Sequence, residues 1–112
     1  MVYINDIIEN MEKALKFCEG LEYREFQKDE KTYYAVIRCI EIIGEAVKNI
    51  PAGIKRKHSD VPWKDMAGMR DKLIHFYFGV DPNMVWCVLK EDMPELLPIL
   101  LEIKAEIENS QK

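Results

Sequence analysis

The apolar side chains of residues 29–49 recur every three or four positions, a spacing that places them on one face of an α-helix. The stretch starts at Asp29, a residue type that caps helices, and it stops just before Pro51. No segment of the chain shows the period-two alternation of a half-buried strand. The sequence therefore predicts a long amphipathic helix and a fold without a sheet. The residues expected to face the core are Tyr33, Val36, Ile40, Ile43, Val47 and Ile50.

Two further features of this long helix carry information. Gly44 lies in its middle, where glycine costs about 1 kcal/mol relative to alanine, and a close approach by another helix would explain it. A stripe of charged residues follows the other face, which indicates either a solvated surface or an interface. These residues are Arg38, Glu41, Glu45 and Lys48.

The same helical spacing recurs in three other regions. Residues 3–18 predict an amphipathic helix, and Gly20 stands where a C-terminal cap belongs. Another amphipathic stretch opens at Pro62, a residue favoured in the first turn of a helix. A fourth region starts with Asp81 followed by Pro82, an N-cap with proline at the first helical position.

The connecting segments complete the predicted topology. Leu21–Lys28 is polar with scattered aromatic residues and predicts a connector or loose turn, and a basic loop is expected after Gly53. Pro94 and Pro98 predict a break or kink before the last helix. The sequence thus favours an all-α fold: an up-and-down bundle of four main helices, with the last region split in two, in a single domain of residues 1–112.

Composition narrows the class of protein. No run of 18 or more apolar residues is present, and the N-terminus lacks the basic and apolar regions of a secretion signal, so a cytoplasmic protein without a membrane span is expected. Cys18, Cys39 and Cys87 are odd in number and lie in apolar helical patterns, which favours buried thiols over disulfides. No closely spaced Cys or His pair suggests a metal site.

Charge is unevenly distributed along the chain. The net charge of −4 argues against a protein that coats nucleic acid non-specifically. Residues 51–75 nevertheless hold six Lys or Arg against three Asp, a net +3, so the remainder carries −7. This basic balance would attract a ligand that carries phosphate. The alternative, equally open, is that Lys55-Arg56-Lys57 is only a solvated loop.

The third helix carries the residues best suited to chemistry. Arg70, Asp71, His75 and Tyr77 lie within eight positions. A helical wheel places Met66, Met69, Leu73 and Phe76 on the stripe that faces the core and places the polar residues on neighbouring stripes. Asp71 lies four residues before His75, where it can bond the imidazole ring. By spacing alone, an ordinary solvated Arg/His pair is the more common explanation.

This run and its flanks resemble the HepT-type HEPN family. The resemblance covers nearly the whole chain and rests on five segments: Pro62-Trp63, then GMRDKLIHFYFGVD from Gly68 to Asp81, Ile42-Ile43-Gly44-Glu45-Ala46 upstream, and Val85-Trp86 and Met93-Pro94-Glu95-Leu96 downstream. Two positions depart from the family's usual pattern. Asp71 stands where Asn is common, and Phe76 stands where an acidic residue is frequent.

The resemblance implies a toxin of a toxin–antitoxin system that is a metal-independent endoribonuclease with no cofactor. It implies a homodimer in which Arg70 and His75 of both copies meet at a cleft and act as catalytic residues on RNA. It also implies an MntA-like nucleotidyltransferase antitoxin that neutralises the toxin by attaching AMP to Tyr77. From the residues themselves, a tyrosine at this place in a helix is more often a packing residue.

The residue types fit metal-free RNA cleavage. Histidine can move protons near neutral pH, and the arginine fork matches phosphate oxygens. Residues five apart on a helix diverge by about 140°, so Arg70 and His75 of one chain do not easily hold one phosphate together. Two antiparallel copies would solve this, with one histidine as base and the other as acid. Asp71 is expected to orient the His75 ring.

Two other classes of protein remain open from the sequence. The chain could be a non-catalytic helical binding module that partners a nucleotidyltransferase, which the acidic net charge favours. It could also be a structural dimer without a ligand, but that would leave the polar residues of the third helix without a role. The intact Arg70/His75 pair favours the enzyme.

Overall fold

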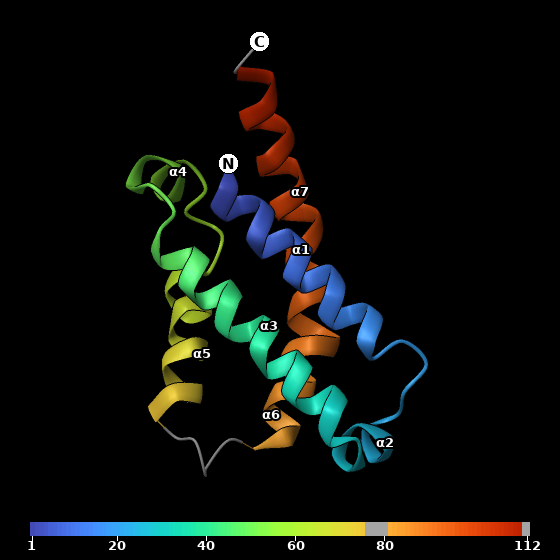
Figure 1. Cartoon of the computed structure of the whole chain (residues 1–112). Coiled ribbons are helices and arrows are strands. Elements are labelled where there is room, and N and C mark those ends of the chain that lie inside the picture. The colour runs from blue at the N-terminus through green and yellow to red at the C-terminus, as the bar shows by residue number, and fades with distance from the viewer. Residues whose placement is uncertain (76–80, 111–112) are drawn as a thin grey trace.

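A computed structural model of the chain describes residues 1–75 and 81–110, and for residues 71–75 it describes the backbone alone. The protein is all-α, as the sequence predicted, and the described residues contain no strand. Seven α-helices and one π-helical turn follow one another among these residues (Figure 1). They are α1 (Val2–Phe17), α2 (Tyr23–Lys28), α3 (Glu30–Lys48), α4 (Ala52–Lys57), α5 (Trp63–His75), α6 (Pro82–Cys87), η1 (Val88–Asp92) and α7 (Met93–Ser110).

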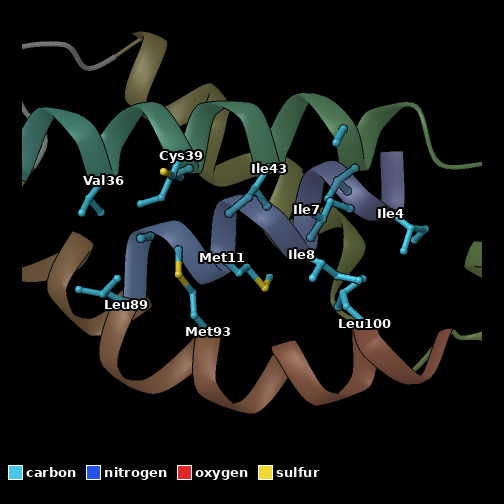
Figure 2. Packing of buried hydrophobic residues seen from close by; sticks show 14 of the residues in the cluster. Ile4, Ile7, Ile8, Met11, Val36, Cys39, Ile43, Leu89, Met93 and Leu100 are labelled. Carbon is cyan, nitrogen blue, oxygen red and sulfur yellow. The ribbon is translucent and has the colours of Figure 1, made fainter. Parts of the chain in front are cut away.

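Helix α3 is the central element of the bundle. It packs against α1 on one side and α5 on the other, while α1 also packs against α7. Figure 2 shows α1 between α3 and α7, with apolar side chains filling both contacts. The helix starts where the sequence predicts, because the Asp29 carboxylate accepts a hydrogen bond from the Thr32 backbone N–H at 3.1 Å. Its predicted core stripe is buried except for Tyr33, which is half-buried.

Two turn signals are confirmed. Gly20 adopts a left-handed conformation with φ of 80° just after α1, which a residue with a side chain would adopt only at a cost. Asp81 caps α6 through a hydrogen bond from the Asn83 N–H at 2.9 Å, and Pro82 occupies the first turn. Local sequence therefore fixes where α1 ends and where the fourth region restarts.

The segment Leu21–Lys28 is not the loose connector that its polar composition predicted. Residues 23–28 form α2, whose start is held by a hydrogen bond from the Glu22 N–H to the Glu25 carboxylate at 3.2 Å. Phe26 is fully buried, and the centroid of its ring lies 5.0 Å from the ring centroid of Trp86 and 5.6 Å from that of Tyr33. Burial of one aromatic anchor thus orders a segment that propensity alone leaves undecided.

The expected basic loop after Gly53 is also helical. Residues 52–57 form α4, and the Lys57 ammonium and the His58 ring lie 2.6 and 3.1 Å from the two carboxylate oxygens of Glu106 on α7. These contacts hold the pKa of Glu106 below its ordinary value, with the Lys57 hydrogen bond as the main cause. A contact distant in sequence therefore holds this segment against the last helix.

The predicted irregularity in the fourth region lies upstream of both prolines. The Met93 N–H bonds the Val88 carbonyl five residues back, so residues 88–92 form a π-helical turn that joins α6 to α7. Pro94 falls in the first turn of α7, where a missing N–H costs little, and Pro98 lies inside that helix. Residues 82–110 are therefore helical without interruption, and the break that the two prolines predicted is replaced by a widened turn within the helix.

The cysteine prediction is correct for two residues and wrong for the third. Cys18 and Cys39 are buried, and burial raises the pKa of both thiols, that of Cys18 to about 11. Cys87, the last residue of α6, is exposed. All three are free thiols. None of the described helices has the length and apolarity needed to cross a membrane.

Candidate functional site

Helix α5 carries the predicted catalytic residues, and its first turn is firmly anchored. Trp63 is buried, and its indole N–H donates a hydrogen bond to the His58 carbonyl at 3.0 Å. Asp65 lies in the first turn, where a negative charge complements the helix dipole. The helix therefore has a fixed starting point, about 10 Å along its axis from Arg70 by the helical rise.

Gly44 explains how α5 approaches α3. A Cβ built on Gly44 would overlap the Arg70 Cβ and lie 3.2 Å from its Cγ. The close approach that the sequence predicted at Gly44 is therefore confirmed, and the residue that fills the space is Arg70 itself. The glycine costs helix stability but lets the base of the arginine side chain lie directly on α3.

Glu45, next to that glycine, holds the arginine head group. The Arg70 Nε lies 3.1 Å from the Glu45 Oε2, an ion pair between α5 and α3. The Arg70 side chain is only 28 % exposed, although the helical wheel had placed it outside the stripe that faces the core. Glu45 is the site residue that sequence reasoning missed. Its signal was present, since the acid directly follows the one glycine in the middle of α3.

The Arg70 side chain lines a groove of about 360 Å³ between α1, α3 and α5. We call it the Arg70 groove, and the described residues that line it are Tyr3, Asp6, Arg38, Glu41, Ile42, Glu45, Ala46 and Arg70. A second ion pair lies here, between Arg38 and Glu41 at 3.2 Å. Among these residues three carboxylates face two guanidinium groups. Three residues of the charged stripe of α3, Arg38, Glu41 and Glu45, therefore form one wall of a polar groove.

The side chains of the remaining predicted site residues lie outside the part of the chain that the structure describes. Asp71 and His75 belong to the helical backbone of α5, but their side chains lie outside the described residues. Tyr77 lies outside them altogether. The structure thus brings Arg70 together with Glu45 and does not test whether Arg70, Asp71, His75 and Tyr77 meet.

The basic residues of the stretch 51–75 lie on two helices, α4 and α5. The tri-basic part of this stretch belongs to α4, which Figure 1 shows beside the N-terminal end of α5, at the opposite end from His75. Lys57 is engaged by Glu106 there. A structural role for Lys57 is thereby favoured over phosphate attraction. In the described part of the chain, no group of three or more His, Cys, Asp or Glu is arranged to hold a metal ion.

Comparison with known proteins places these residues in a family. The family described as "Ribonuclease HepT-like" matches residues 7–103, which include α3, α5 and the Arg70 groove's two ion pairs. A "Probable ribonuclease HepT" of Thermococcus cleftensis is 52 % identical over 94 residues, 84 % of this chain and 86 % of that one.

Two further relatives extend the similarity along almost the whole chain. A "Putative RNase" of Methanocaldococcus jannaschii is 46 % identical over 112 aligned positions, covering 96 % of this chain and 93 % of the relative. A "Putative RNase" of Caldanaerobacter subterraneus is 45 % identical over 101 positions, covering 90 % of each. No solved structure matches the chain significantly.

Proposed function

Because this chain belongs to the HepT-like ribonuclease family, we propose that it is a metal-independent endoribonuclease in which Arg70 and His75 are the catalytic residues. The observation that carries the proposal is the position of Arg70. Its side chain packs against Gly44 and forms an ion pair with Glu45 in a groove open to solvent. A guanidinium held in this way is preorganised for a phosphate, because its orientation is set before the substrate arrives.

The proposed reaction is an attack of the RNA 2′-hydroxyl on the adjacent phosphorus. The P–O bond to the 5′-oxygen breaks, leaving a 2′,3′-cyclic phosphate and a free 5′-hydroxyl. A base removes the 2′-proton and an acid protonates the leaving oxygen, roles suited to imidazole near neutral pH. The arginine stabilises the extra negative charge on phosphorus oxygens in the transition state. Asp71, one helical turn before His75, would orient its ring.

We further propose that the active unit is a homodimer. The backbone of α5 is helical through His75, so positions 70 and 75 lie about 140° apart around the helix axis. One chain therefore presents the two residues in different directions. A two-fold arrangement would bring the histidine of one protomer to the arginine of the other and supply both an acid and a base.

The proposed regulation is modification of Tyr77 by a nucleotidyltransferase antitoxin of the MntA-like kind. An AMP group there would add bulk and a negative phosphate two residues after His75, which would exclude RNA by occlusion and repulsion. Co-expression with such an enzyme followed by intact-mass and peptide analysis tests this. An unmodified Tyr77 in protein that has lost its toxicity would contradict it.

The first test is cleavage of RNA by purified, unmodified protein in EDTA. Arg70→Ala and His75→Ala are each expected to lower the rate roughly a hundredfold or more. Two control variants remove the same types of side chain elsewhere: Arg56→Ala on the exposed surface of α4, and His58→Ala. Both should cleave RNA as the wild type does. Equal cleavage by all variants would indicate a contaminating nuclease and would contradict the assignment of Arg70 and His75 as catalytic residues.

One observation favours a second function, that of a non-catalytic binding module for a nucleotidyltransferase. The described residues of the Arg70 groove carry one more carboxylate than guanidinium groups, so the groove is not strongly attractive to RNA. If unmodified wild-type protein cuts no RNA but forms a stable complex with the nucleotidyltransferase, this second function replaces the first.

A further inference from the structure

A second hollow lies on the other side of α5, away from the Arg70 groove. It encloses about 410 Å³ between α5 and the η1–α7 segment, and buried side chains of α1, α3 and the start of α7 form its floor. Four methionines line it: Met11 on α1, Met66 and Met69 on α5, and Met93 on α7. We call it the methionine groove. Its volume falls within the range of natural binding pockets.

The methionines form both the floor and a wall of this groove. Met11 and Met93 are buried, each 2 % exposed, and Figure 2 shows both among the core side chains between α1 and α7. Met66 and Met69 are half-exposed on α5. Unbranched, polarizable methionine side chains can repack around different apolar shapes, which is why they are frequent on surfaces that accept amphipathic helices.

The rim of the groove is acidic on both sides. Asp60 and Asp65 lie at its α5 side, and Asp92 and Glu95 lie at its η1–α7 side. All four are exposed, and none forms an ion pair with another described residue. None of the described residues lining the groove is basic. An apolar floor between two unneutralised acidic rims would attract a ligand with an apolar face and positive flanks.

We propose that the methionine groove binds an amphipathic segment of a partner protein, with large apolar side chains on the methionines and Lys or Arg on the four rim carboxylates. RNA is excluded as the occupant, because four carboxylates repel phosphate. The chain's own basic segment is a poor occupant. In α4, Ile54 packs against the core of its own chain, and Lys57 is bonded to Glu106. This inference does not depend on ribonuclease activity.

The test uses a synthetic probe. A fluorescein-labelled helical peptide of about four turns, with leucines on one face and lysines elsewhere, is titrated with the full chain. The control peptide replaces each lysine by glutamate. The lysine peptide is expected to bind saturably with 1:1 stoichiometry, and the glutamate peptide is expected not to bind. In protein carrying ¹³C-methyl methionine, the signals of Met11, Met66, Met69 and Met93 should shift, while those of Met1 and Met84, outside the groove, should not.

Charge reversal at the rim distinguishes groove binding from general attraction to an acidic protein. Asp65→Lys combined with Glu95→Lys should weaken the lysine peptide about tenfold or more. Glu9→Lys with Glu102→Lys makes the same change of net charge on exposed positions outside the groove. That control should bind within about twofold of wild type, since only long-range steering changes. Thermal melting checks that all variants are folded.

Three results would overturn the inference. The first is that both double variants weaken binding of the lysine peptide equally. The second is that the lysine peptide fails to bind while spermine shifts the signals of the groove methionines, which would indicate that the ligand is a small organic cation. The third is a shift of the same methionine signals with protein concentration alone. That result would make the groove an interface between copies of this chain.

Discussion

Two grooves flank helix α5, and they differ in almost every physical property although they share the same three helices. Met69 lines one and Arg70 the other, because consecutive helical residues point about 100° apart. On α3, Ile40 and Ile43 face the methionine groove, whereas Glu45 faces the Arg70 groove. A single-residue step along a helix therefore separates an adaptable apolar surface from a polar surface fixed by ion pairs.

The difference shows how a small bundle can hold two kinds of site. In the Arg70 groove, Gly44 and Glu45 hold one guanidinium in a defined place, so geometry is specified at some cost in local stability. In the methionine groove, two buried methionines belong to the core itself, so stability and shape are coupled there. Substitutions should affect stability most in the methionine groove and positioning most in the Arg70 groove.

The largest loss of stability is expected for Met93→Ala, on the floor of the methionine groove. Met93 is 2 % exposed, and truncating a buried methionine removes apolar contacts and leaves a cavity, at a cost of about 2–5 kcal/mol. Met93→Leu conserves volume and should cost less than about 1.5 kcal/mol. Urea unfolding of both variants measures this. If Met93→Ala costs no more than Met93→Leu, the floor is not part of the core.

Gly44→Ala is expected to have the next largest effect, at the helix contact beneath Arg70. The new methyl group would overlap the Arg70 Cβ, and forcing the two helices apart should cost about 1–3 kcal/mol. Gly68→Ala, on α5, meets nothing within 4 Å and should stabilise the helix by about 0.5–1 kcal/mol. Opposite signs of the two effects are the expected result. Two variants that are equally stable would contradict the close approach.

Glu45→Gln should separate positioning from stability. The Arg70–Glu45 pair is partly exposed, so its loss should change the free energy of unfolding by less than about 1 kcal/mol. If Arg70 is catalytic, the misdirected guanidinium should lower kcat for RNA cleavage by roughly tenfold. Glu41→Gln, which removes the partner of Arg38, is the matched control. A loss of activity that follows melting temperature in both variants would indicate only a structural role.

At neutral pH the smallest effect on stability is expected from the thiols, whose contribution changes only as the pH rises. Burial raises the pKa of Cys18 from its ordinary value of 9.0 to about 11, so the unfolded chain loses this proton first. Stability should fall as pH rises from about 9 towards 11, and the slope should be smaller in Cys18→Ala. At neutral pH a thiol reagent should label exposed Cys87 quickly and the buried Cys18 and Cys39 only on unfolding.

Much of the fold could be predicted from the chain alone. The periodicity of α1 and α3, the left-handed turn at Gly20 and the Asp29 and Asp81 caps are local features, and all are confirmed. Helices α2 and α4 were missed because short helices depend on tertiary contacts, here the burial of Phe26 and the Glu106 contacts. The position of the π-helical turn was missed because the prolines alone do not fix where a helix widens.

For the candidate site, the sequence by itself predicted which residues are candidates for the chemistry and that Gly44 requires a close neighbour. It also determined the family, since residue types and spacing are local properties of the chain. Only the tertiary structure decided that this neighbour is Arg70, that Glu45 holds it, and that a methionine-lined groove lies behind it. These facts depend on how α3, α5 and α7 pack together. Helical periodicity specifies which face of each helix is buried but not which partner it meets.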